Sequence, residues 1–426
     1  MSLTTNSRRA AWAAAAVLAF ALLLLPALAG AHGRDHGFPG NGPRGGHPSH
    51  SHPGHGHPGH GFPGHGHPGF PGHGRGEVVN TMTRNLYLGA DLAPAIGAPS
   101  LEAFVAATGQ ILREVSANDF PTRARGLAQE ILRQKPDLVG LQEVALWRTG
   151  PPSLAPVLSG EPSATTVRYD YLQLLLDQLN KGPDRYEVVD VQNEFDLEAP
   201  GDENGIPNDG PAAQGIPNAE INGRLTMRDV ILARRGAGVQ TASPQSGNFK
   251  ALLAVPILGK PLTIKRGWTA VDAKVRGSGW FRFVNTHLEA FDPAALVPSI
   301  RAQQASELVG PEGPATSSLP VVLVGDLNSD DDTVEPGDQQ AYRALLEAGM
   351  VERSTAVPLG CCLRSSLLAE GAGGSVADFD HQVDHVMTRD PAEISLQSSA
   401  VTGLLPVNGF WDSDHAGLFS ALRFSH

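Results

Sequence analysis

The stretch that most constrains the fold is Val321 to Asp330, with the sequence VVLVGDLNSD. Four consecutive aliphatic residues between Pro320 and Gly325 are typical of a short strand buried on both faces, although a buried helical turn has the same pattern. If the backbone stays extended beyond Gly325, Asp326 and Asn328 project to one face. A carboxylate and a carboxamide placed in this way can orient a water, a phosphate or a metal ion. An ordinary Asp/Asn turn at the end of a strand has the same residues, so the rest of the chain must separate the two interpretations.

The first 31 residues are typical of a secretory signal peptide. They combine Arg8-Arg9, a mostly apolar run from Ala10 to Leu28, and the small residues Ala29-Gly30-Ala31. This pattern predicts cleavage near Ala31 and an extracellular protein, with a retained signal-anchor as the alternative. No later segment approaches 18 consecutive apolar residues, so we expect no transmembrane span in the mature chain.

Residues 32–76 repeat variants of His-Gly-His-Pro-Gly and Gly-Phe-Pro-Gly. Because such a density of glycine and proline is incompatible with helices and with sheet ladders, we expect a His/Gly/Pro-rich disordered tether. It holds 11 of the 16 histidines of the chain. Imidazoles at this density can bind Zn²⁺, Ni²⁺ or Cu²⁺, but the segment can equally be a solvated spacer. The folded domain is therefore expected to span residues 77–426.

The net charge of this domain limits the kinds of partner that it can bind. The whole chain carries a formal charge of −12, and residues 1–76 contribute five arginines against one aspartate, which leaves about −16 for the rest. An acidic domain is unsuited to gripping long nucleic acid by counterion release, although it can still cut nucleic acid locally. The two cysteines, Cys361 and Cys362, are adjacent, which excludes a disulfide framework and leaves open a vicinal disulfide, buried thiols or a soft-metal site.

Periodicity predicts alternating strands and helices after residue 76. The polar segment Gln192 to Arg224 is expected to be a surface excursion and a solvated loop, with a role in specificity or Ca²⁺ binding as the alternative. Asp330 to Asp332 is also expected to be a solvated loop. Adjacent strands interleaved with helices predict an α/β fold in which sheets pack on each other under helices. Helices are expected over 101–115, 121–134, 169–180, 299–309 and 339–349, and strands over 77–88, 137–144, 185–191, 229–233, 271–275, 281–287, 321–326 and near Val383 and Leu418.

Several of these strands end in, or lie next to, polar residues that suit phosphoryl chemistry. Each has an ordinary structural explanation when taken alone, such as a turn or an ion pair, but their joint occurrence favours a single polar cleft at the strand ends. The set comprises Asn85, Gln142-Glu143, Asn285 with His287, Asp326 with Asn328, Asp384, and Ser413-Asp414-His415.

The ordered segments TRNLYLGADL, DLVGLQEVALW, FVNTHLEAF, LVGDLNSD, QVDHVM and SDHAGLFSALR resemble the endonuclease/exonuclease/phosphatase superfamily. The resemblance covers Glu77 to Phe424 and is strongest to secreted bacterial members. It implies a four-layer αββα sandwich, with two mixed β-sheets flanked by helices and the site at one mouth of the sheets.

The resemblance also implies roles. Glu143, supported by Asn85 and Asp414, would bind Mg²⁺ or Mn²⁺, which prefer such oxygen ligands. His415 would contact the scissile phosphate, with Asp384 orienting its ring.

Three further residues resemble catalytic groups of the family. Asp326 would activate or position the attacking water, Asn328 would hold a phosphate oxygen and His287 would assist proton transfer. Arg228 and Asn285 are weaker candidates for substrate contacts. Gln382 stands where many relatives carry arginine, so that arginine's role would fall to another residue.

The function implied is a secreted, divalent-metal-dependent phosphoesterase that hydrolyses phosphodiester or phosphomonoester bonds by in-line attack of an activated water. The substrate could be a small molecule, a lipid head group or a nucleic acid, as in sphingomyelinase-like or phospholipase-C-like enzymes or an extracellular nuclease. An alternative of another class is a non-catalytic, metal-capturing surface protein that uses the His-rich tether. No obligate protein partner is inferred.

Overall fold

The computed structural model describes residues 77–206, 215–291, 296–331, 339–355, 359–389 and 393–425. The signal peptide expected at 1–31 and the tether expected at 32–76 lie outside these residues. Among the described residues, no helix has the length and apolar character that crossing a bilayer requires.

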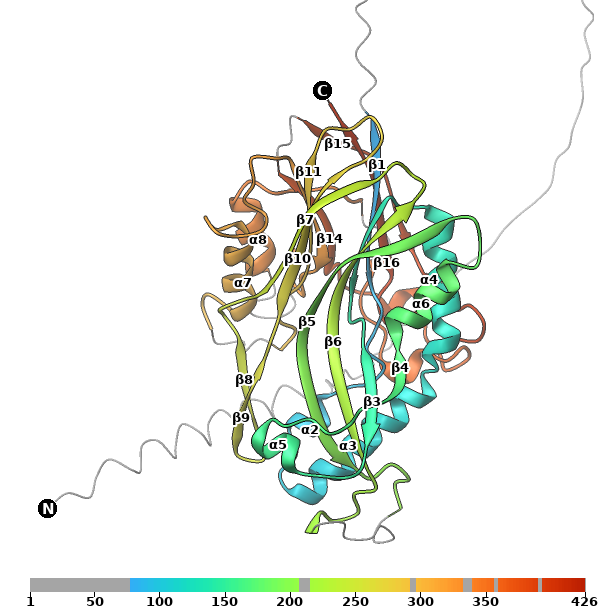
Figure 1. Ribbon diagram of the computed structural model, residues 1–426, viewed down its shortest axis with the longest axis vertical. Helices are drawn as coiled ribbons and strands as arrows, with labels where there is room; N and C mark the ends of the chain where they lie inside the picture. Colours follow the sequence, from blue (N-terminus) through green and yellow to red (C-terminus); the bar gives the residue numbers. More distant parts are fainter. Residues whose placement is uncertain are drawn as a thin grey trace, which may run out of the picture. The chain divides into compact units, whose positions relative to one another are not determined.

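The first sheet of the domain is mixed and has eight strands (Figure 1). Seven of them lie side by side in the order β15-β16-β1-β2-β6-β3-β4, and β5 pairs with β6. β1 and β2 run parallel, whereas β16 is antiparallel to β1. The strands are β1 (Val78–Asn85), β2 (Leu138–Gln142), β3 (Leu146–Gly150), β4 (Thr166–Asp170), β5 (Arg185–Gly201), β6 (Ile221–Arg235), β15 (Ile394–Thr402) and β16 (Gly417–Phe424).

The second sheet is also mixed, with the order β13-β14-β12-β11-β10-β7. β11 and β12 run parallel, and β14 is antiparallel to β12. Its strands are β7 (Gln240–Asn248), β10 (Gly267–Lys274), β11 (Phe281–His287), β12 (Val321–Asp326), β13 (Val351–Glu352) and β14 (Asp384–Arg389). A separate hairpin consists of β8 (Leu253–Ile257) and β9 (Lys260–Ile264).

The two sheets pack face to face through aliphatic and aromatic side chains. Val79 and Leu138 of the first sheet join Phe283, Val322 and Val386 of the second in one buried cluster. Each such side chain contributes roughly 1.5–3 kcal/mol when fully buried. The aliphatic run of β12 is buried on both faces, as its sequence predicts.

Helices cover the outer face of each sheet. Phe104, Phe120 and Tyr171, from three helices, pack against the first sheet, and Leu308 and Leu345 belong to the cluster on the second. The result is the predicted four-layer αββα sandwich (Figure 1). The helices are α2 (Ala93–Ile96), α3 (Leu101–Ala117), α4 (Phe120–Gln134), α5 (Ala155–Ser159), α6 (Tyr171–Leu179), α7 (Ile300–Val309) and α8 (Gln340–Glu347), with 3₁₀ turns at Ser365–Leu367 and Val376–Asp378.

The expectation of a surface excursion over 192–224 is wrong for both ends of that segment, where residues 192–201 and 221–224 belong to strands. β5 and β6 form a long antiparallel hairpin that pairs Arg185 with Arg235 and Gly201 with Ile221. Polar residues in the hairpin pair across it, as when Arg224 contacts the Asp196 carboxylate at 2.6 Å. Two irregularities in the ladder break the alternation of polar and apolar residues, which hid the strands from a pattern search.

Candidate functional site

The site lies where several strands of both sheets begin or end. Asn85, His287 and Asp326 are the last residues of β1, β11 and β12, and Glu143 directly follows β2. Asp384 begins β14 and pairs in register with Asp326. The topology therefore brings residues far apart in sequence to one mouth of the sandwich, as the sequence predicts.

Asp326 is the centre of this arrangement and is almost completely buried. One carboxylate oxygen, Oδ1, accepts the backbone N–H of Asn328 at 2.9 Å, and the other, Oδ2, accepts the Asn85 amide at 3.0 Å. The Nε2 atoms of His287 and His415 lie 3.5 and 3.7 Å from the same Oδ2. Burial raises the pKa of Asp326, and the charge of His415 opposes this shift.

His415 is held by a buried carboxylate. Its Nδ1 lies 2.7 Å from Oδ2 of Asp384. Although burial alone would lower the pKa of His415, Asp384 and then Asp326 raise it well above its ordinary value. The imidazole is therefore positively charged at neutral pH, and its Nε2–H is directed toward Asp326.

His287 is in the opposite state. Its Nδ1 faces the Arg266 guanidinium, with 3.0 Å between Nδ1 and Nη1. Burial and then Arg266 lower the pKa of His287 well below its ordinary value, so the ring is neutral. A neutral ring that accepts a hydrogen bond at Nδ1 carries its proton on Nε2, on the side of Asp326.

Glu143 and Asp414 line one cavity beside this set. One Glu143 oxygen accepts the Leu88 N–H at 2.7 Å, and the backbone of Glu143 has a left-handed φ of 54°, which is uncommon outside glycine and is found at functional sites. Burial raises the pKa of Asp414 to about 6, and the Glu143 charge adds to the shift. Two half-buried carboxylates that repel each other suit a divalent cation, so this pair fits Mg²⁺ or Mn²⁺.

Asn85 is less suited than Glu143 and Asp414 to bind a metal ion directly, because both polar atoms of its side chain are hydrogen-bonded. Its carbonyl oxygen accepts the Tyr87 N–H at 2.8 Å, while its amide nitrogen binds Asp326. The side chain thus holds Asp326 in place beside the Glu143–Asp414 pair.

A buried arginine fixes the loops that carry these ligands. Arg123 of α4 donates to the carbonyl oxygens of Leu86 and Asp412, at 2.8 and 2.9 Å. It therefore ties the end of β1 to the segment that precedes Asp414.

Two predicted substrate residues lie elsewhere. Asn285 is fully buried between the sheets, where its amide group bonds to Gln142 and to the Leu141 carbonyl. Arg228 contacts Asp170 at 2.6 Å and donates to the Val144 carbonyl. The polar groups of both side chains are thus bonded to other parts of the fold.

Two expectations about the end of β12 are also wrong in detail. The strand stops at Asp326, and Asn328 has a left-handed φ of 47°, so extended alternation does not place its side chain. The Asn328 amide donates to the Leu288 carbonyl at 3.1 Å. Asp330, expected in a solvated loop, is buried and accepts the Gln382 N–H at 3.1 Å.

The sequence reasoning missed a second acidic group behind His287. Ligand atoms of Glu194, Asp229 and His287 lie within 4.8 Å of one another, and both carboxylates are buried. Burial raises the pKa of Glu194 to about 8 and that of Asp229 well above its ordinary value. Asp229 could have been recognised, because it begins the buried run DVILA of β6. Glu194 could not, because it lies in the segment that was expected to be a loop.

The adjacent cysteines form a vicinal disulfide beside His415. The Sγ atoms of Cys361 and Cys362 each lie 3.7 Å from Nε2 of His415. Of the three states left open by the sequence, the structure has the disulfide.

The chain was also compared with known proteins. No curated protein gives a significant match. Among solved structures, an endonuclease/exonuclease/phosphatase family protein from Bacteroides thetaiotaomicron is 12% identical, with 82% of this chain and 99% of that chain covered and a TM-score of 0.45. The mannosyl-6-phosphatase of the same organism is 15% identical, with 81% and 100% covered and a TM-score of 0.43. An endonuclease/exonuclease/phosphatase from Beutenbergia cavernae is 19% identical, with 82% and 72% covered and a TM-score of 0.48.

The family model of the endonuclease/exonuclease/phosphatase family matches residues 85–415, which include every strand-end residue described above. The chain belongs to the endonuclease/exonuclease/phosphatase family.

Proposed function

We propose that this protein is an exported, divalent-metal-dependent hydrolase of phosphate esters. The observation that carries the proposal is the buried Asp326 carboxylate, which has the Nε2 atoms of His287 and His415 at 3.5 and 3.7 Å. Burial and then Arg266 lower the pKa of His287, whereas Asp384 raises the pKa of His415 against the effect of burial. A base flanked by one cation and one neutral donor suits a water that attacks an anionic phosphoryl group.

Asp326 is the group best placed to take the proton of the attacking water. Burial raises its pKa toward the working range of a general base. The neutral His287 donates from Nε2 toward the same carboxylate and orients it. The water oxygen then bonds to phosphorus as the ester oxygen leaves.

His415 serves the phosphoryl oxygens in this scheme. Its Nε2 lies on the same side of the site as Asp326, at 3.7 Å. Because an in-line displacement puts the attacking and leaving oxygens on opposite sides of phosphorus, we assign His415, which lies beside Asp326, to the phosphoryl oxygens and not to the leaving oxygen. Its charge stabilises the oxygens between them, and a solvent water supplies the proton to the leaving group.

Glu143 and Asp414 would hold Mg²⁺ or Mn²⁺, with Asn85 adjacent. When bound, such an ion neutralises charge on the phosphoryl group. The acidic balance of the chain favours small or lipid phosphoesters over long duplex DNA. The signal-like residues 1–31 support export.

The test is hydrolysis of bis-p-nitrophenyl phosphate, plasmid DNA and sphingomyelin with Mg²⁺, with Mn²⁺ and with a chelator. We expect chelator-sensitive turnover of at least one substrate. His415→Gln should lower kcat by about 10²- to 10³-fold, since it removes the charge that faces the phosphoryl group.

His381→Gln is the matched control, because this histidine is partly exposed beside Asp330 and outside the catalytic set. Its turnover should stay close to that of the unmodified protein. Activity that survives both chelation and His415→Gln would refute the proposal, as would failure on all three substrates.

A further inference from the structure

An apolar pocket opens directly beside the catalytic groups. Its volume is about 200 Å³, and Glu143, Asp414 and Arg266 belong to its lining. For comparison, a cavity of about 150 Å³ holds a benzene ring. The pocket is therefore large enough for a substituent of several carbon atoms.

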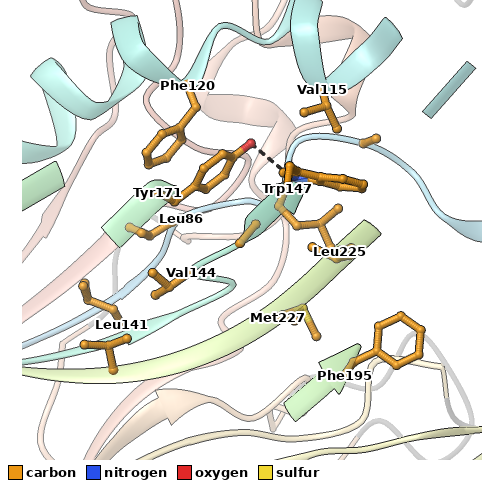
Figure 2. Close-up of a cluster of buried hydrophobic side chains, with 14 of the residues drawn as sticks. Leu86, Val115, Phe120, Leu141, Val144, Trp147, Tyr171, Phe195, Leu225 and Met227 are labelled. Carbon is orange, nitrogen blue, oxygen red and sulfur yellow. Dashed lines mark hydrogen bonds between the residues drawn. The ribbon is translucent and has the colours of Figure 1, made fainter. Parts of the chain in front are cut away.

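The wall of the pocket nearest the first sheet is built by β3, β5 and β6. Trp147 pairs in register with Leu225, and Met227 follows two residues later on the same face of β6. Figure 2 shows these three side chains together with Phe195 of β5. All four side chains are more than nine-tenths buried in the protein.

The other walls are apolar as well. They come from α2, α3 and the β8–β9 hairpin, and include Leu92, Ile96, Phe104 and Ile264. Leu92 and Ile96 are only half-buried. An apolar space of this kind holds water poorly, so it favours an alkyl group over the polar parts of a sugar or nucleotide.

We propose that this pocket binds the alkyl or acyl chain of the phosphoester substrate, and that the substrate class is a lipid-like phosphoester. The inference rests on the proposed function, because the pocket is assigned to the substrate on the ground that Glu143 and Asp414 belong to its lining. A phosphate held at those residues places its ester substituent at the mouth of the pocket. The first several carbons of the chain then lie against Met227 and Leu92 in the pocket.

Binding can be measured independently of turnover with alkylphosphonates, which cannot be hydrolysed. Calorimetric titration of the full-length protein with methyl-, butyl- and hexylphosphonate, in Mg²⁺, should show tighter binding for longer chains. Each buried methylene is expected to lower Kd about fourfold, so hexyl, with five more methylenes, should bind on the order of 1000-fold more tightly than methyl.

Substitutions in the pocket test whether the dependence of binding on chain length arises there. Leu92→Gln and Met227→Gln place a polar group in the pocket, so each should reduce the hexyl-to-methyl ratio by about tenfold. Leu405→Gln makes the same change as Leu92→Gln at a side chain that is 71% exposed. This control should keep the ratio. Leu92 is half-buried, so its substitution tests the pocket even if Met227→Gln fails to fold.

The same homologues, prepared as p-nitrophenyl alkyl phosphodiesters, test turnover. Rising kcat/KM with chain length, lost in both pocket variants, is the expected result. If Kd in the unmodified protein does not change with chain length, the assignment of a lipid-like substrate is wrong. It is also wrong if neither pocket variant changes the hexyl-to-methyl ratio of affinities. Absence of hydrolysis with the chain-length dependence of binding intact overturns the catalytic proposal and leaves the pocket assignment standing.

Discussion

Replacing Asp384 with asparagine would remove one charge from a buried pair while keeping the shape of the side chain. Asp384 lies 2.7 Å from Nδ1 of His415, and both side chains are almost fully buried. Two opposite charges about 4 Å apart attract by about 4 kcal/mol at an effective dielectric constant of 20. Since one pKa unit corresponds to about 1.4 kcal/mol, the pKa of His415 should fall by roughly 1–3 units.

The expected result is a change in the pH profile as well as a loss of rate. Activity that needs a charged His415 is present below the pKa of His415 and is lost as the pH rises through it. Because the pKa of His415 lies well above its ordinary value, Asp384→Asn should move this alkaline limb to lower pH by the same 1–3 units. The measurement is kcat/KM for a chromogenic phosphodiester with Mg²⁺ across pH 5–10.

Asp380→Asn is the matched control for this experiment. The Asp380 side chain is 74% exposed in the segment before β14, so the same substitution there should leave the profile unchanged. An unshifted alkaline limb in Asp384→Asn would refute the assignment of a charged His415 held by this carboxylate. A loss of rate without a shift of the alkaline limb would indicate that Asp384 has a structural role alone.

Three further changes probe other parts of the chain. Glu143→Gln should weaken Mg²⁺ binding, measured by calorimetry, at least tenfold, because one of two adjacent carboxylates loses its charge; unchanged affinity would remove Glu143 from the metal centre. Glu194 has a pKa raised from 4.5 to about 8, so its stabilising effect is present below pH 4.5 and is lost as the pH rises toward 8. In urea unfolding with a chelator, Glu194→Gln should therefore flatten the fall in stability between pH 5 and 8, and an equal slope in both proteins would contradict the shift. Deletion of residues 32–76 should leave turnover intact and abolish most Ni²⁺ or Zn²⁺ retention on an affinity column; a large loss of turnover would show that the segment takes part in catalysis.

The strand ends could be predicted because their signals are local. The aliphatic run before Asp326 and the apolar residues before Glu143 mark buried strands, and the polar residue that ends each strand is read directly from the sequence. Parallel pairing in the sheets then brings such ends to one edge. His287 lies in the site for the same reason, whereas Asp384 begins β14 and His415 lies just before β16, and these strands run antiparallel to β12 and β1.

The errors arise where the sequence does not show which face of a strand points inward. Arg228 and Asp229 are neighbours on β6, so their side chains point to opposite faces. The predicted one, Arg228, points away from the catalytic set, and the overlooked one, Asp229, points into it. Asn285 and His287 share a face of β11, but Asn285 lies deeper, where it bonds to the other sheet. Depth along a strand depends on how two sheets pack, which is not a local property.

Because of the Cys361–Cys362 disulfide, a reducing assay buffer is expected to change how the protein responds to metal ions. Both sulfur atoms lie 3.7 Å from Nε2 of His415. A thiol reductant would convert this neutral neighbour into two soft donors next to the ring nitrogen, and such a trio binds Zn²⁺. We therefore expect micromolar zinc to inhibit the reduced protein more strongly than the oxidised one, as dose–response curves with and without dithiothreitol would show. Equal inhibition in both states would mean that the sulfur pair does not influence the histidine, and preparations of the enzyme could then be handled without regard to redox history.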